Sequence, residues 1–308
     1  MRLVRSRLYI TLLIALNGAG SAQTAPEASQ IGDWQARYAN GDRLLQEGRT
    51  EEALAELRPA LAGAAGAAGR GVVLGALGQA EFQAGRYLEA KRHFEAAIPL
   101  WTAQSREWAA ALSNAGVSYL ALGEYAHAEE VFRQALEIVP DEPKLWQNLG
   151  QARFSMGQRR EAEECLRTAL SLASRLHAPS VASDLATLLE ANHQYAKAAA
   201  TLTEAIAQAG PGRDRARMQA NLGVLLWRLN RRSESAAQLR AALAEMESAV
   251  GLHHPDIAKV LQDYREVLRK TGQKAEATAV AARAAAIRSS FARHAGDRRN
   301  SVDWRDLK

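Results

Sequence analysis

The sequence contains a single cysteine, and only 6% of its residues are aromatic. One cysteine cannot form an internal disulfide, so a disulfide-stapled scaffold is excluded and Cys165 is predicted to be a packing residue within a helix. Few aromatics beside 47% hydrophobic residues indicate a core rich in Ala and Leu, which favour helices. Stability is therefore expected to come from the stacking of helices alone.

The motifs of common catalytic sites are also missing. The sequence has no His-Glu-x-x-His zinc motif, no Gly-x-Ser-x-Gly nucleophile motif and no Walker phosphate loop. A glycine-rich stretch at residues 63–71 has no Lys-Ser or Lys-Thr after it, and is predicted to be a flexible joint. His253 and His254 precede Pro255 and are expected to begin a helix instead of binding metal. We predict that the chain is not an enzyme and uses no cofactor.

A long hydrophobic run is absent as well. The apolar run at residues 8–16 is far shorter than the roughly 20 residues that span a bilayer. Three arginines precede it and small residues follow it up to Ala22, a layout typical of a secretory signal peptide. We predict a signal peptide over residues 1–22, with no integral membrane segment after its removal. Export to the periplasm or the medium follows, and a bacterial setting fits best.

A large net charge is absent as well. The formal net charge is +5, and removal of residues 1–22 takes away three arginines and no acid, which leaves +2. The basicity is thus partly a property of the targeting segment. It is poor evidence for nucleic-acid binding, and no nucleic-acid partner is predicted.

What the sequence does contain is a repeat. A six-residue phrase returns seven times, at steps of 37, 38, 34, 36, 37 and 42 residues. Such a period is typical of stacked supersecondary units, each too small to bury its own apolar face. Glycine opens most copies and supplies the left-handed backbone that ends a helix. The seven copies begin at Gly48, Gly85, Gly123, Gly157, His193, Asn230 and Gly272.

Each copy predicts two helices joined by a turn. An apolar helix leads up to the phrase, and a second helix follows with apolar residues at helical spacing, as at Ala128, Phe132 and Ala135. A small residue recurs at a fixed place in the first helix, where it lets the two antiparallel helices approach closely. This small residue is Gly78, Gly116, Gly150, Ala186 or Gly223.

These features resemble the tetratricopeptide repeat pattern, over about residues 34–291. The resemblance implies an all-α fold, a right-handed superhelical solenoid of about seven helix-turn-helix repeats. An N-terminal extension at residues 23–33 would precede the solenoid, and a charged tail at residues 292–308 would follow it. The likeness is carried best by Trp146, Leu149, Gly150, Gly157, Ala162 and Ala169.

The last copy also resembles the longer repeats of kinesin light chain-like proteins. The likeness rests on a His-Pro loop within residues 251–258 and on the 42-residue final step. The copy departs from the pattern, because Arg265 stands at the place of the small residue and Ala281 at that of a large core residue. The last repeat is therefore expected to act as a cap.

The resemblance also implies where a partner would bind. In tetratricopeptide arrays the first helices line a concave groove. Two residues before the small residue the chain has Asn114, Asn148 and Asn221, while Asp184 and Asp263 hold this place in two other copies. Amide side chains both donate and accept hydrogen bonds, which suits the backbone of an extended peptide. The alternative is that they satisfy neighbouring helices, and for the two aspartates this structural role is favoured.

Other residues of the first helices complete the predicted site. Aromatic and arginine side chains on a groove wall are typical affinity anchors, although each could instead pack against a neighbouring repeat. Asn114 and Lys144 match two places of the carboxylate clamp of chaperone-binding relatives, but Gly75, Gln79 and Asn148 do not complete it, so a chain-terminal carboxylate is not predicted as ligand. The remaining predicted contacts are Gln79, Gln151, Phe154, Trp227 and Arg228, with Phe82 beside them.

The sequence thus predicts an exported adaptor that binds an extended segment of another protein in its groove. A self-associating or cell-envelope assembly scaffold, using the convex face or the C-terminal tail, is the alternative. The sequence leaves the partner and the oligomeric state open.

Overall fold

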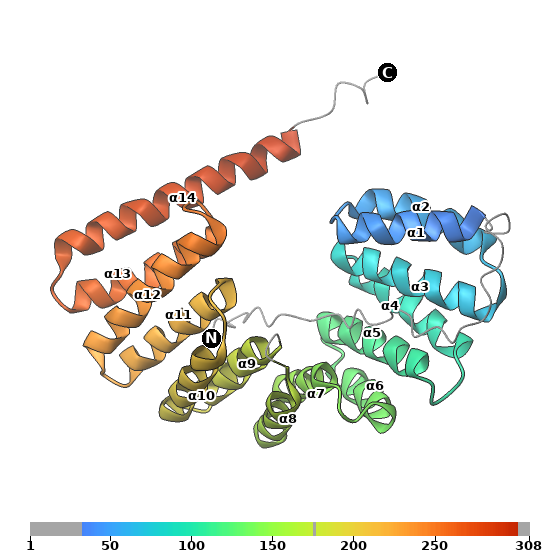
Figure 1. Ribbon diagram of the computed structural model, residues 1–308, viewed down its shortest axis with the longest axis horizontal. Coiled ribbons are helices and arrows are strands. Elements are labelled where there is room, and N and C mark those ends of the chain that lie inside the picture. The colour runs from blue at the N-terminus through green and yellow to red at the C-terminus, as the bar shows by residue number, and fades with distance from the viewer. Residues whose placement is uncertain (1–32, 175–176, 301–308) are drawn as a thin grey trace. The chain divides into compact units, whose positions relative to one another are not determined.

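The computed structural model describes residues 33–174 and 177–300, and no strand occurs in these ranges (Figure 1). The predicted signal peptide, nearly all of the N-terminal extension and the last eight residues lie outside them. The helices are α1 (Asp33–Gln46), α2 (Thr50–Gly63), α3 (Gly66–Gln83), α4 (Tyr87–Ala97), the short 3-10 helix η2 (Ile98–Leu100), α5 (Arg106–Leu122), α6 (Tyr125–Ile138), α7 (Pro143–Ser155), α8 (Arg159–Leu172), α9 (Ala178–Ala191), α10 (Tyr195–Gln208), α11 (Arg213–Arg228), α12 (Arg232–Val250), α13 (Pro255–Lys270) and α14 (Lys274–Asn300).

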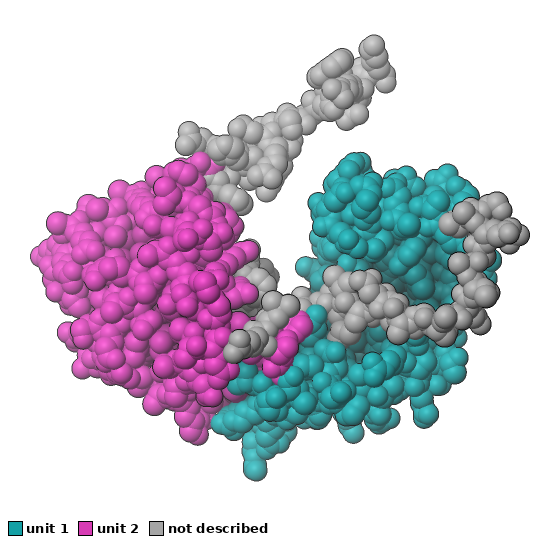
Figure 2. Space-filling view, in the orientation of Figure 1, with its two compact units in different colours: residues 1–172 teal, residues 173–308 magenta. Residues whose placement is uncertain are grey.

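The α-helices pair in chain order into seven helical hairpins across the described residues. The chain divides into two compact units, which Figure 2 shows in teal and magenta. Unit 1 ends at Leu172 and contains the four hairpins α1–α8, and unit 2 begins at Ala173 and contains the three hairpins α9–α14. The predicted all-α repeat architecture is confirmed. Helix α14 continues to Asn300, past the residue 291 at which the sequence pattern ends.

The turn of every hairpin is made by the residue that opens the repeated phrase. The five glycines there have φ between +74° and +83°, and His193 and Asn230 have φ of +59° and +61°. In the third turn, the backbone N–H of Gly123 donates to the carbonyl of Leu120 at 3.1 Å, and that of Glu124 to Tyr119 at 2.9 Å. These bonds satisfy carbonyls that the helix end leaves without partners, so the predicted turn chemistry is confirmed at all seven positions.

The recurrent small residue lies where the two helices of a hairpin pack most closely. A Cβ on Gly116 would lie 2.6 Å from the ring of Phe132, and one on Gly78 would lie 2.5 Å from the ring of Phe94. In unit 2, a Cβ on Gly223 would lie 2.7 Å from Leu239. The first hairpin has the same device in Gly41, which faces Leu57 and which the sequence reading missed.

The glycine-rich stretch at residues 63–71 is only partly a joint. Gly66, with φ of +70°, lies at the α2–α3 connection. Gly69 and Gly71, however, are helical, and a Cβ on them would lie 2.9 Å from the indole of Trp34 and 2.7 Å from that of Trp101. The prediction of a flexible joint was wrong for this part, because the missing side chains let two rings pack on the backbone of α3.

The last hairpin has no small residue at the crossing place, and it buries the tyrosine that directly precedes this place. Arg265 is exposed, and the neighbouring Tyr264 is only 3% exposed. The Tyr264 hydroxyl donates to Glu276 Oε1 at 2.9 Å and accepts from Arg240 Nη2 at 3.0 Å, which links α12, α13 and α14. At the start of α13, His254 Nδ1 accepts from the backbone N–H of Asp256 at 3.2 Å, so the predicted helix-start role of His254 is confirmed.

Candidate binding surface

Within each unit the first helices of neighbouring hairpins contact one another. In unit 1, α1 contacts α3, α3 contacts α5 and α5 contacts α7; in unit 2, α9 contacts α11 and α11 contacts α13. The second helices pack extensively on first helices only. The closer spacing puts the first helices on the inner side of each unit. We call these surfaces the first-helix face of unit 1 (α1, α3, α5, α7) and the first-helix face of unit 2 (α9, α11, α13).

All nine residues predicted to contact a partner lie on first helices, but they belong to two units. Helices α3, α5 and α7 of unit 1 carry Gln79, Asn114, Lys144, Asn148, Gln151 and Phe154. Helix α11 of unit 2 carries Asn221, Trp227 and Arg228.

The amides of unit 1 have polar atoms without partners. Asn148 is 1% exposed, and its Nδ2 has no hydrogen-bond acceptor within the described part of the chain. Asn114 is half-buried, and its buried Oδ1 likewise has no donor there. A buried polar atom without a partner loses the hydrogen bond that water would have made, which costs about 1–3 kcal/mol. The predicted alternative, in which amides satisfy neighbouring helices, does not account for these two atoms.

The sequence reading missed a third polar group on the same surface. Ser113 is 1% exposed, and no residue in the described ranges partners its Oγ. Ser113 directly precedes Asn114 on α5, so its position was available from the spacing. A small hydroxyl residue is common in helices, however, and only the coordinates show that this one is buried and unpaired.

Lys144 lies on the same side of α7 as Asn148 and Gln151, because residues three, four and seven apart share a helix face. It is half-buried and forms no ion pair with a described residue. The other half-buried cations of unit 1 each have a carboxylate partner, at 2.7 Å for Arg37, 3.0 Å for Arg86, 2.9 Å for Lys91 and 3.0 Å for Arg153. Lys144 also lies in the first turn of its helix, where the helix dipole disfavours a cation.

Of the residues predicted to contact a partner, Trp227 in unit 2 already packs against other residues of its own unit. Trp227 packs against the hydrophobic core of unit 2, and the guanidinium of Arg232 lies 5.7 Å from the centroid of its ring. Asn221 is half-buried and Arg228 is exposed. Burial raises the pKa of the Asp263 carboxyl, and the charge of Lys259 opposes this shift. A packing role is thus evident for Trp227, whatever else it does.

Cys165 is part of the packing of unit 1. It is 2% exposed, and Arg153 Nη1 donates to its Sγ at 3.3 Å while Arg153 Nε donates to Glu129 at 3.0 Å. Burial raises the pKa of the Cys165 thiol, so the reactive thiolate is disfavoured. The prediction of a packing cysteine is confirmed.

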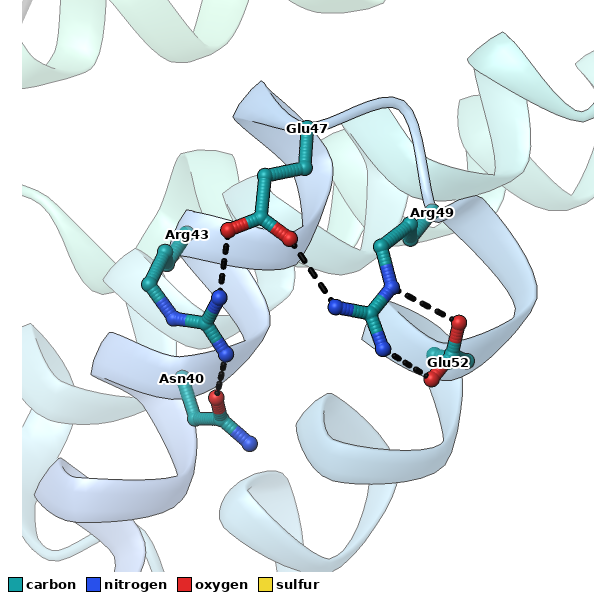
Figure 3. A network of polar contacts seen from close by, with 5 residues as sticks. All are labelled: Asn40, Arg43, Glu47, Arg49 and Glu52. Carbon is teal, nitrogen blue, oxygen red and sulfur yellow. Dashed lines mark hydrogen bonds and ion pairs between the residues drawn. The ribbon is translucent and has the colours of Figure 1, made fainter.

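The turn of the first hairpin carries a network of charged groups on the surface (Figure 3). Glu47 lies between Arg43 and Arg49, Arg49 Nε donates to Glu52 at 2.8 Å, and Arg43 Nη2 donates to Asn40 at 2.7 Å. The hydrogen bond from Arg49 lowers the pKa of the Glu47 carboxyl, with help from Arg43. Exposed pairs of this kind contribute little to stability, and all its charges are partnered, so the network marks no binding site.

The described residues contain neither a candidate metal site nor a candidate membrane span. No group of three or more His, Cys, Asp and Glu side chains lies close enough to hold a metal ion. None of the helices is both long and apolar enough to cross a membrane.

Comparison with known proteins gives the family. Tetratricopeptide repeat family models match residues 69–141, 119–178 and 215–256. No curated protein matches the chain significantly in sequence.

Solved structures of tetratricopeptide repeat proteins share the fold. One from Parabacteroides merdae is 17% identical with a TM-score of 0.58, and covers 77% of this chain and 86% of its own. Pseudomonas aeruginosa pilF is 21% identical with a TM-score of 0.56, covering 77% and 97%. The kinesin light chain-like repeats of Podosopora anserina are 21% identical with a TM-score of 0.51, covering 56% and 93%. The three family-model matches, together with the seven hairpins and their turn residues, show that the chain is a tetratricopeptide repeat protein.

Proposed function

We propose that this protein is an exported, non-enzymatic adaptor that holds an extended segment of a partner protein against the first-helix face of unit 1. Tetratricopeptide repeat proteins in general mediate protein–protein interaction. The observation that carries the proposal is the pair of buried, unpartnered amide atoms, Asn114 Oδ1 and Asn148 Nδ2.

The two atoms have complementary needs. Asn114 Oδ1 accepts a hydrogen bond, and Asn148 Nδ2 donates one. A peptide backbone offers an N–H and a carbonyl at every residue, so an extended segment crossing α5 and α7 would meet both needs independently of its side chains when each buried amide turns outward to reach it. Each such hydrogen bond contributes about 0.5–1.5 kcal/mol net to binding. It also removes the free-energy cost of leaving a buried polar atom without a partner.

Side chains around the amides would then add selectivity. Lys144 offers a charge without an internal partner, and Gln79 and Gln151 offer further amides on neighbouring first helices. Phe154 on α7 is half-buried and offers apolar surface. Asn221, Trp227 and Arg228 would form a separate contact surface on unit 2.

Export is proposed from the sequence alone, on the layout of residues 1–22. Fractionation of cells that express the full chain, with N-terminal sequencing of the product, tests it. A product that begins at Gln23 in the periplasm or medium is expected, and a full-length cytoplasmic product would contradict export.

Mutation of the amides tests the binding site. In-cell crosslinking followed by mass spectrometry would compare the unchanged protein with Asn114→Ala, Asn148→Ala and Asn221→Ala combined. Gln134→Ala on the second helix α6 is the matched control, since its amide already donates to Glu130 at 2.8 Å. A partner that is lost in the triple variant and kept in the control supports the proposal. A partner kept by a folded triple variant would refute it and favour the scaffold that binds through its second helices or tail.

A further inference from the structure

One glycine within a helix has no structural reason among the described residues. Gly75 lies in the middle of α3, has no left-handed backbone and is half-buried. A Cβ built on it would meet no described atom within 4 Å. Glycine inside a helix loses more conformational freedom on folding than alanine does, so this position destabilises α3 without any packing gain.

The other glycines that lie within helices with described side chains are explained by their contacts or, for Gly66, by a left-handed backbone. Those at hairpin crossings face a large side chain of the second helix, Gly63 faces the Cβ of Trp34, and Gly69 and Gly71 face the indoles of Trp34 and Trp101. Gly71 is the closest comparison, because it lies one turn before Gly75 on the same helix and its missing side chain is filled by Trp101. The space over Gly75 is open instead.

Gly75 lies on α3, the first helix that precedes α5 with its unpartnered polar groups. It precedes the crossing residue Gly78 by three residues, just as Ser113 precedes Gly116 on the adjacent helix α5. Ser113 is the 1% exposed side chain whose Oγ has no described partner. Gly75 on α3 and Ser113 on α5 are thus equivalent positions of two helices that contact each other. The first has open space above it, and the second has a buried hydroxyl without a partner.

We propose that the space over Gly75 is a subsite for one bulky apolar side chain of the bound segment. The proposal rests on the proposed function and adds the class of side chain that the site selects. Helical spacing puts Gln79 one turn and Phe82 two turns beyond Gly75, and Trp101 covers the turn before it. Phe82 is half-buried, with its ring 5.0 Å from that of Tyr87. Two aromatic rings favour an apolar occupant, since the peptide groups of the helix between them are already hydrogen-bonded, and the half-buried Asn114 on α5 binds its backbone.

The first test measures thermal stability, because an empty subsite predicts that a larger residue at position 75 stabilises the protein. Gly75→Ala should raise Tm by about 1–3 °C, since a methyl group fits and the helix propensity improves. Gly71→Ala is the matched control and should lower Tm, because its Cβ would lie 2.7 Å from Trp101. A fall in Tm with Gly75→Ala would contradict the open space and overturn the proposal.

Binding gives the second test, with phage-displayed random dodecapeptides as the probe. Peptides selected on the mature chain should share a Leu, Ile, Met or aromatic residue, and should bind Gly75→Trp at least tenfold more weakly. Ala96→Trp, at an exposed position of the second helix α4, controls for the bulk of the new side chain and should bind normally. Thermal unfolding confirms that each variant is folded.

The outcomes separate this inference from the function on which it rests. Peptides that lose affinity for Asn148→Ala but keep full affinity for Gly75→Trp would overturn the subsite and leave the binding surface standing. Peptides that bind both variants normally, or a selection that enriches no peptide, would overturn the binding surface and the subsite together.

Discussion

Unit 1 and unit 2 are built from the same hairpin, yet they differ at one place on their first helices. Two residues before the crossing residue, the third and fourth hairpins of unit 1 have Asn114 and Asn148, both with a buried atom that lacks a partner. Unit 2 has Asp184, Asn221 and Asp263 at this place, and none of them has such an atom. The crossing itself is alike, since Gly116 meets Phe132 in unit 1 and Gly223 meets Leu239 in unit 2. The crossing residue therefore serves the packing of both hairpins, while the residue two places before it differs between the units and is available for binding.

The largest effect is expected at the crossing that the units share. Gly116→Leu would place its Cβ 2.6 Å from the ring of Phe132, with three further carbon atoms to accommodate, and should lower the free energy of unfolding by about 3 kcal/mol. Gly223→Leu should do the same in unit 2. Hydrogen exchange read helix by helix would locate each loss in its own unit. Tolerance of either change would show that the crossing is less close than described.

The next effect distinguishes the last hairpin of unit 2. Tyr264→Phe removes the hydrogen bonds to Glu276 and Arg240 and should cost about 1–2 kcal/mol, measured by urea unfolding. Burial raises the pKa of Tyr264 in the folded state, so its contribution is present below the unfolded pKa of about 10 and is lost as the pH rises through the folded pKa. The variant should lose less stability at alkaline pH than the unchanged protein. An identical alkaline profile would contradict the assignment.

A smaller effect, with the opposite sign, is expected at the amide of unit 1. Asn148→Leu is close to isosteric and removes a buried donor without a partner, so stability should stay level or rise by up to about 1 kcal/mol. Partner binding should be lost at the same time. Asn221 has no buried atom without a partner, so Asn221→Leu in unit 2 is the control for stability and should show no gain. A clear loss of stability in Asn148→Leu would mean that the amide is structural.

The smallest effect is expected at Asp263, which holds in unit 2 the position that asparagine holds in α5 and α7. Asp263→Asn should stabilise unit 2 slightly at neutral pH, because burial disfavours the charged carboxylate. Since the folded pKa of Asp263 is raised, the unchanged protein loses stability as the pH rises through that pKa. The advantage of the variant should therefore vanish below about pH 4 and grow above it. An advantage that is independent of pH would have another cause.

Much of the fold was predictable because hairpin turns are local. The spacing of one phrase located all seven left-handed residues, including His193 and Asn230. Contacts between distant residues were not predictable in this way. The packing of Trp34 on Gly69 and of Trp101 on Gly71 joins segments whose sequences carry no sign of it, so these glycines were misread as a joint. Tyr264 was missed because it lies one residue before the expected position.

The sequence predicts on which helices the residues of the candidate site lie, but not which of their polar atoms lack a hydrogen-bond partner. Helical spacing put the nine predicted contacts on first helices, where the structure has them. Whether a buried amide is satisfied depends on neighbours from other repeats, which the spacing does not give. That is why Asn148 and Asn221 read alike in sequence and differ in the structure.

Site-specific photocrosslinking in cells tests the central claim most directly. A benzophenone amino acid would replace Gln151 on the first helix α7, and Arg133 on the second helix α6 would serve as the control position. The account predicts that a partner protein is captured at residue 151, that it is not captured at residue 133, and that Asn148→Leu abolishes the capture. Capture at residue 133 alone, or capture at residue 151 that survives Asn148→Leu, would contradict it.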